Sequence, residues 1–231
     1  MRICGFQKMT LLDFPGKVAC TVFTGGCNMR CPFCHNALLV NEAAELETIP
    51  EETILSYLKK RQGILDGVAI TGGEPLLWPN LRGFIEKVRA LGFLVKLDTN
   101  GTKPAFLKAL AHDGLLDYVA VDIKNSKEKY ALTCGVPDFD IRPVEETVSF
   151  LLERTVPFEF RTTVVSEFHT TSDIRKIGEW IRGADRYFLQ AFTSHEELVG
   201  NMELHAASKE EMEEMRQAAA PYVGEASIRG L

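Results

Sequence analysis

The chain has 231 residues and a formal net charge of −6, with 45% hydrophobic and 25% charged residues. That length suffices for one large domain with a substantial buried core, and the composition is that of an ordinary globular protein. The acidic balance argues against a broad nucleic-acid-binding surface, and the longest apolar runs are far too short to span a bilayer. No secretory leader is recognisable, so we expect a cytoplasmic protein without nucleic-acid or membrane partners.

Short β-rich runs alternate about six times with amphipathic helical stretches. The runs cover 18–23, 67–71, 93–99, 118–123, 158–165 and 186–192, and helices are expected near 50–62, 79–91, 103–112, 143–154, 172–183 and 208–219. This alternation predicts an α/β fold with a parallel sheet. A closed eight-unit barrel typically needs about 250 residues, so six units favour a partial, open (β/α)6 TIM-like barrel. An open doubly wound sheet is the competing topology.

We expect a single domain over residues 1–231, with a core over about 12–195 and a helical tail over about 196–231. Polar and glycine-rich segments follow the ends of the first four predicted strands: GGCNMRC, TGGEP, DTNG and DIKN. The carboxyl ends of parallel strands are where sites assemble in barrels and in doubly wound sheets. The four segments are therefore predicted to meet at one site.

Three cysteines and a histidine cluster directly after the first predicted strand. Cys27, Cys31 and Cys34 have C-x3-C-x2-C spacing, and His35 follows the last of them. A Cys3His zinc site suits these ligand types, but a histidine adjacent to the last cysteine would struggle to reach the same ion. A redox C-x2-C pair leaves Cys27 unexplained. Because four-iron clusters usually take four thiolates, a cluster held by three would keep one iron open for a ligand, and this interpretation fits best.

The cysteine spacing, with Phe33 just before the last cysteine, resembles the signature of radical S-adenosylmethionine (SAM) enzymes. The resemblance implies that Cys27, Cys31 and Cys34 hold a [4Fe–4S] cluster whose open iron is chelated by SAM. One electron from the cluster then cleaves SAM to methionine and a 5′-deoxyadenosyl radical. His35 is interpreted as packing near the cluster.

The TGGEP segment resembles the second motif of the same family. The resemblance implies that the backbone of Gly72 and Gly73 and the carboxylate of Glu74 bind the amino group of the methionine moiety of SAM. Glycines let the backbone approach a ligand closely, and a carboxylate accepts hydrogen bonds from an ammonium group. A plain strand-to-helix turn with a capping glutamate is the alternative.

The DTNG and DIK segments resemble parts of the glycyl-radical-enzyme activases. In these enzymes two aspartates, a threonine and a backbone carbonyl shape a monovalent-cation site beside the SAM carboxylate, which a lysine also contacts. Carried over by position, the cation ligands would be Asp98, Thr99, Asp122 and the carbonyl of Ala120, and further cofactor contacts would be Asn100 and Lys124. Hard oxygen ligands suit a hard cation. Taken alone, DTNG could be an Asn-Gly turn and DIK a strand end with solvated charges.

Three further segments, DFPG, FEFRTTVV and YFLQAF, resemble the anaerobic ribonucleotide reductase activating proteins and their relatives. Arg161 is expected to contact the cofactor or the target peptide, with a salt bridge inside the barrel as the alternative. Gln190 is similarly placed. His195 is a candidate SAM contact, because a histidine has that role in the related activase.

The resemblance thus implies an enzyme that takes a hydrogen atom from a glycine of a partner enzyme, in first place an anaerobic (class III) ribonucleotide reductase. A flavodoxin- or ferredoxin-like protein would donate the electron. No protein general base is needed, because the adenosyl radical takes the hydrogen atom. Alternatives are a glycyl radical enzyme of the pyruvate formate-lyase type, a small-molecule substrate, and a zinc-stabilised binding module without turnover.

Overall fold

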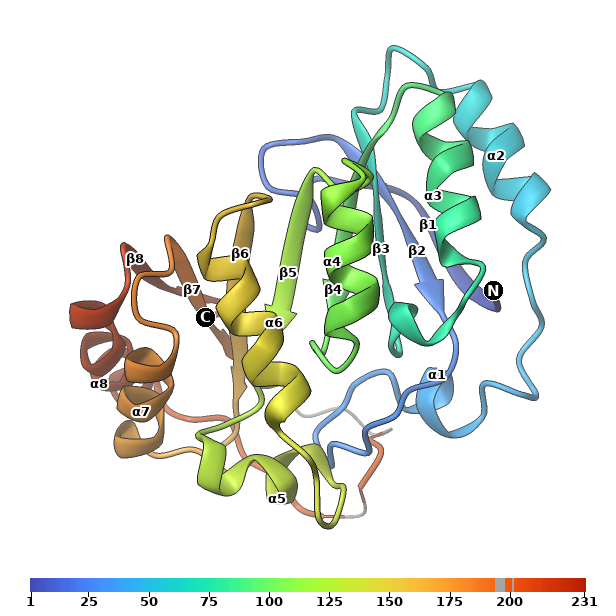
Figure 1. Ribbon diagram of the computed structural model, residues 1–231. Coiled ribbons are helices and arrows are strands. Elements are labelled where there is room, and N and C mark those ends of the chain that lie inside the picture. The colour runs from blue at the N-terminus through green and yellow to red at the C-terminus, as the bar shows by residue number, and fades with distance from the viewer. Residues whose placement is uncertain (194–197, 201) are drawn as a thin grey trace.

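An eight-stranded sheet forms the frame of the protein, with its strands in chain order from β1 to β8 (Figure 1). The computed structural model describes residues 1–193, 198–200 and 202–231. β1 (Ile3–Thr10) runs antiparallel to β2 (Ala19–Thr24), and each later strand is parallel to the strand before it. No helix within these residues is long and apolar enough to cross a membrane.

The six strands predicted from the sequence are all present, as β2 to β7. Those after β2 are β3 (Gly67–Gly72), β4 (Leu94–Thr99), β5 (Tyr118–Asp122), β6 (Phe158–Val164) and β7 (Arg186–Ala191). They form because short runs of Val, Ile, Leu and Phe suit strands that are buried on both faces. The chain has the predicted α/β architecture with a parallel sheet, that of a partial TIM-like barrel.

Helices between the strands cover the outer face of the sheet, and α3, α4 and α6 lie in front of it in Figure 1. The predicted helices correspond to α2 (Glu51–Lys59), α3 (Leu81–Ala90), α4 (Pro104–His112), α6 (Arg142–Leu152), α7 (Thr171–Trp180) and α8 (Lys209–Ala219). Capping boxes at Thr170 and Ser208 begin α7 and α8.

Two short helices, α1 (Ala37–Asn41) and α5 (Tyr130–Cys134), lie beyond the carboxyl ends of the strands in Figure 1. The described residues also contain three single 3-10 turns, at Pro75–Leu77, Lys127–Lys129 and Ala220–Tyr222. α1 and α5 therefore flank the edge at which the four polar segments were expected to meet.

Two edge strands differ from the expectation. The sequence pattern does not predict β1, and β8 (Glu225–Arg229) lies in the tail that was expected to be helical. That tail holds α8 and then β8, which pairs with β7. Edge strands are half-exposed and carry polar residues, so neither strand shows the buried apolar run by which the others were recognised. Within the described residues β1 and β8 share no ladder, so the barrel stays open between them.

The DFPG segment closes the end of the barrel at which the parallel strands begin. Phe14 is buried in a small apolar cluster with Ala19 and Tyr118, the first residues of β2 and β5. A Cβ on Gly67, the first residue of β3, would lie 2.9 Å from the Phe14 ring. Phe14 therefore forms a floor, and the opposite end of the barrel is left for the site.

Candidate functional site

The cysteine loop, residues 25–36, follows β2 and lies at the carboxyl edge of the sheet. Cys27, Cys31 and Cys34 line one pocket there, and the same pocket is lined by residues from the ends of β3 to β7. None of the three cysteines forms a disulfide. The four polar segments singled out in the sequence therefore meet at one place.

Glycines allow the TGGEP segment to lie against the cysteine loop. The N–H of Gly73 donates to the carbonyl of Thr24 at 2.9 Å. A Cβ on Gly73 would lie only 2.0 Å from the carbonyl oxygen of Gly26, so no larger residue fits. The side-chain amide of Asn36 donates to the carbonyl of Gly72 at 3.0 Å. Both TGGEP glycines line the pocket, where their backbone is close to any ligand bound there.

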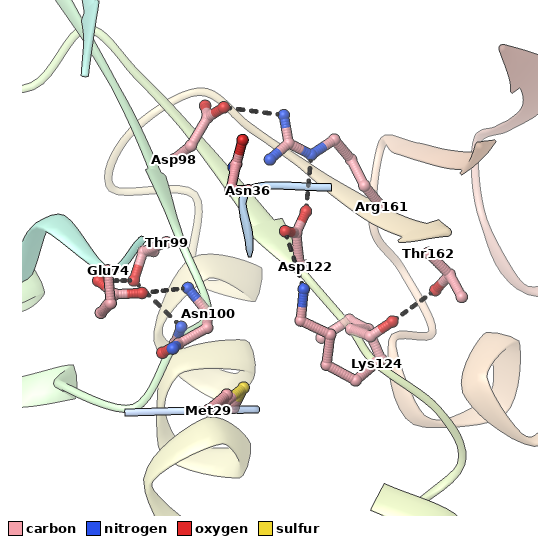
Figure 2. Close-up of polar contacts among 12 residues, drawn as sticks. Met29, Asn36, Glu74, Asp98, Thr99, Asn100, Asp122, Lys124, Arg161 and Thr162 are labelled. Atoms are coloured by element: carbon pink, nitrogen blue, oxygen red, sulfur yellow. Dashed lines mark hydrogen bonds and ion pairs between the residues drawn. The ribbon is translucent and has the colours of Figure 1, made fainter. Parts of the chain in front are cut away.

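Arg161 of β6 lies between two carboxylates, Asp98 of β4 and Asp122 of β5 (Figure 2). Its Nη1 is 3.0 Å from Asp98 Oδ2, and its Nε is 2.9 Å from Asp122 Oδ1. Lys96 forms a further ion pair with Asp98, and Lys124 Nζ lies 3.1 Å from Asp122 Oδ2. These five side chains carry three positive and two negative charges, so the network has one excess positive charge.

The charges in this network keep one another ionised. Burial alone would raise the pKa of Asp98 and Asp122, but Arg161 and the neighbouring lysines hold the pKa of both carboxyls below the usual range. Burial would lower the pKa of Lys124, but Asp122 and the nearby thiols outweigh this effect and raise it. The carboxylates and the lysine are therefore charged at neutral pH.

The contacts of Arg161 involve two of the residues expected to bind a monovalent cation, Asp98 and Asp122. The salt bridge inside the barrel, given above as the alternative role of Arg161, is present. The Thr99 hydroxyl, another expected cation ligand, donates to Glu74 Oε1 at 2.8 Å. The guanidinium thus supplies positive charge between Asp98 and Asp122 from the chain itself, and a cation at this place stays a prediction.

Glu74 is fully buried and connects the end of β3 with the end of β4. Its carboxylate accepts a hydrogen bond from Leu76 N at 3.0 Å. It also accepts hydrogen bonds from Thr99 Oγ1 at 2.8 Å and Asn100 N at 2.6 Å (Figure 2). Burial raises the pKa of Glu74 to about 7 despite these three donors. The carboxylate thus has partners of its own, and the contact expected between Glu74 and the SAM ammonium stays a prediction.

Several residues of the site were missed in the sequence, among them Asn36, Lys96 and Asn28. Lys96 is almost completely buried although it is charged, and it pairs with Asp98. Its position two residues before Asp98 in a predicted strand puts both side chains on the same face, so the pairing could have been foreseen. Asn28, in the cysteine loop, accepts a hydrogen bond from Asn100 Nδ2 at 2.8 Å, which no sequence pattern indicates.

Two histidines near the site, His35 and His169, differ in their surroundings. The ring of His35 stacks on Phe192, with 5.4 Å between the ring centroids, in agreement with packing beside the cysteine loop. His169 is buried, with Nε2 2.8 Å from the carbonyl oxygen of Lys124. The candidate contact His195 lies outside the described residues. Gln190 lines the pocket, as expected from its place on β7.

The donor set fits a [4Fe–4S] cluster held by three thiolates. Among the described residues, no group of three or more His, Cys, Asp or Glu side chains is arranged to hold one ion. Cys27, Cys31 and Cys34 line one pocket, where each thiol can bind a different iron of a [4Fe–4S] cluster. Burial raises the pKa of the Cys31 thiol to about 12, and metal binding deprotonates such thiols.

A partial α/β barrel with a three-thiol loop at the carboxyl edge of its strands is a frame for iron–sulfur chemistry. Residues 21–181 match the Radical SAM superfamily, which covers most of the chain. The chain therefore belongs to the radical SAM superfamily, and it is an enzyme whose cofactors are a [4Fe–4S] cluster and SAM.

The similar proteins include more than one kind of radical SAM enzyme. A Methanocaldococcus jannaschii protein provisionally named a glycyl-radical enzyme activating enzyme is 30% identical over 98% of this chain and 95% of its own. A 7-carboxy-7-deazaguanine synthase of Methanopyrus kandleri is 33% identical, over 48% of this chain and 51% of its own. A solved domain of a pyruvate-formate lyase-activating enzyme from Bacteroides vulgatus has a similar structure, with a TM-score of 0.57. The match covers 71% of this chain and 99% of that domain. Because the sequence identity is 19%, this match shows the fold alone.

Proposed function

We propose that this chain is a glycyl-radical-enzyme activating enzyme whose partner is an anaerobic (class III) ribonucleotide reductase. The observation that carries the proposal is one pocket in which three thiols face a charged network with an excess positive charge. Support for the class of target comes from the M. jannaschii protein, which is similar along nearly its whole length. The resemblance of DFPG and FEFRTTVV to the reductase-activating proteins supports the partner.

In this proposal Cys27, Cys31 and Cys34 hold the cluster, and the network holds SAM. Lys124 lines the pocket and would hold the SAM carboxylate, because the excess positive charge of the network can neutralise a buried anion. The backbone of Gly72 and Gly73, which has no side chains in the way, would bind the methionine moiety.

Asp98, Asp122 and Arg161 act together in this proposal. Each carboxylate is bound to the guanidinium, so neither can turn towards the SAM carboxylate and repel it. Thr99 and Asn100 are held in place by Glu74. His195, which lies outside the described residues, remains a candidate further contact.

The bound cluster and SAM supply the radical that takes a hydrogen atom from the partner's glycine. The role of the chain is to hold and orient the cofactors, and none of its side chains is needed as a general base. The reductant is a flavodoxin- or ferredoxin-like protein. A small-molecule substrate is the second candidate, favoured by the similarity of half the chain to a 7-carboxy-7-deazaguanine synthase.

The test mixes anaerobically reconstituted protein, SAM and reductant with candidate partners, and records electron paramagnetic resonance (EPR) spectra. We expect the doublet of a glycyl radical with a class III ribonucleotide reductase, and no doublet with the Cys31→Ala variant. The Cys4→Ala variant is the matched control, because Cys4 belongs to β1 and is not among the residues that line the pocket. A doublet only with a pyruvate formate-lyase would replace the partner. 5′-Deoxyadenosine formation without a radical on any partner would favour a small molecule.

A further inference from the structure

Three side chains form a closed ring of hydrogen bonds beside Cys27. Asn100 Nδ2 donates to Asn28 Oδ1 at 2.8 Å, and Asn28 Nδ2 donates to Thr102 Oγ1 at 2.9 Å. Thr102 Oγ1 donates back to Asn100 Oδ1 at 2.7 Å. The ring joins the cysteine loop, which contains Asn28, to the DTNG segment after β4.

The orientation of the Asn100 amide is determined by a backbone group. The N–H of Thr102, which can only donate, lies 3.1 Å from Asn100 Oδ1. Oδ1 must therefore face Thr102, and the NH2 group must face the cysteine loop. There Nδ2 lies 3.9 Å from Cys27 Sγ, within hydrogen-bonding range of a sulfur atom.

The backbone of Asn100 is held equally firmly. Its N–H donates to Glu74 Oε2 at 2.6 Å, and Glu74 is fully buried. The buried carboxylate thus positions the residue whose amide faces the sulfur. This gives Glu74 and Asn100 a shared structural role that involves no contact with SAM.

Cys27 differs from the other two cysteines in its donors. Besides Asn100 Nδ2, the N–H of Met29 donates to Cys27 Sγ at 3.4 Å. Within the described part of the chain, the structure records no such donor to the sulfur of Cys31 or Cys34. Hydrogen bonds to the ligand sulfurs are one determinant of the reduction potential of an iron–sulfur cluster.

We propose that Asn100 is a positioning residue for the cluster, whose amide donates to the Cys27 thiolate and raises the reduction potential. The donor withdraws charge from the sulfur, and it favours the reduced cluster more because that form carries one more negative charge. The inference rests on the superfamily's cluster, not on the identity of the partner enzyme, so it stands or falls separately from the proposed function.

The test is an EPR-monitored redox titration of reconstituted protein without SAM. In the Asn100→Ala variant we expect about a tenfold rise in the ratio of oxidised to reduced cluster at a fixed solution potential, or about 59 mV for a one-electron couple. The Asn100→Asp variant keeps the acceptor oxygen for Thr102 and the side-chain shape. It should shift in the same direction and further, because it replaces the donor with a negative charge.

The Thr102→Val variant is the matched control. It opens the ring but keeps the Thr102 N–H that orients Asn100, so its potential should equal that of the unaltered protein. The proposal is overturned if the Asn100→Ala variant, loaded to the same iron content, has the potential of the Thr102→Val control, or if either Asn100 variant is easier to reduce. A merely structural role would change iron content or thermal stability without this shift in potential.

Discussion

Glu74 shows at the residue scale how burial and hydrogen bonding oppose each other in this pocket. Its carboxylate is fully buried beneath the end of β4, yet it accepts three hydrogen bonds. Burial is the larger effect, and it raises the pKa of Glu74 from 4.5 to about 7. Below pH about 4.5 the group is protonated in the folded and the unfolded chain alike. Between these two values the unfolded chain loses the proton more readily, so folding becomes less favourable as the pH rises.

The Glu74→Gln variant tests this balance. Glutamine cannot ionise, so the stability of the unaltered protein relative to the variant should fall by roughly 3 kcal/mol as the pH rises from 4.5 to 7. Urea unfolding of both proteins at a series of pH values measures the difference, in which the titrations of all other groups cancel. A difference that stays constant over this range would show that Glu74 ionises normally.

Among single residues, the sequence indicates candidates by residue type and spacing. It does not indicate which ion-pair or hydrogen-bond partners those candidates have. Cys27, Cys31 and Cys34 stand out because cysteine is rare and their spacing is characteristic. Arg161 was recognised, but the choice between a cofactor contact and a salt bridge depends on the register of β5 and β6, which aligns Asp122 with Arg161. Sequence patterns do not contain that register.

At the scale of elements, the position of the cysteine loop depends on its contact with the carboxyl end of α5. Gly135, which ends the helix, has φ +67°, and the N–H of Arg30 donates to the carbonyl of Cys134 at 2.9 Å. A Cβ on Gly135 would lie 2.1 Å from the carbonyl oxygen of Arg30. The helix end and the cysteine loop therefore fit together only when a glycine is present.

A pair of glycine variants separates this contact from backbone strain. Gly114 has nearly the same conformation, φ +65°, but a Cβ there would meet nothing within 4 Å. Both Gly114→Ala and Gly135→Ala should lose about 1–2 kcal/mol from the left-handed backbone. Only Gly135→Ala should also bind clearly less iron per chain on reconstitution. Equal iron contents in the two variants would contradict the claim that contact with the end of α5 positions the cysteine loop.

The elements themselves were predictable to an unequal degree. The strands β2 to β7 were recognised because buried parallel strands are continuous apolar runs, and the longer helices because they are amphipathic. β1 and β8 were missed because one side of each has no neighbouring strand. α1 and α5 have five residues each, which is too short for a helical period to show.

At the scale of the whole molecule, an ion pair connects the last strand, β8, with the buried strand β6. Arg229 of β8 lies 2.9 and 3.1 Å from the two carboxylate oxygens of Glu159 on β6, which is almost completely buried. The Tyr118 hydroxyl donates to the same carboxylate at 3.1 Å. The open edge of the barrel is thus connected to its core across β7.

The Arg229→Met variant tests this connection. It leaves Glu159 buried without its cation, which should cost about 3 kcal/mol and lower the melting temperature by roughly 6–12 °C. The double variant with Glu159→Gln should recover much of the loss, because no unpaired buried charge remains. If the single variant melts within a degree of the unaltered protein, β8 is not held by this pair.

The central claim is that the chain takes a hydrogen atom from a protein glycine, and isotope transfer tests it most directly. The partner, a class III ribonucleotide reductase, is prepared with glycine deuterated at the α-carbon and incubated with reconstituted protein, SAM and reductant. We predict that mass spectrometry finds one deuterium in the 5′-deoxyadenosine, in step with the growth of the glycyl radical signal. Unlabelled 5′-deoxyadenosine in the presence of the fully deuterated partner would contradict the account.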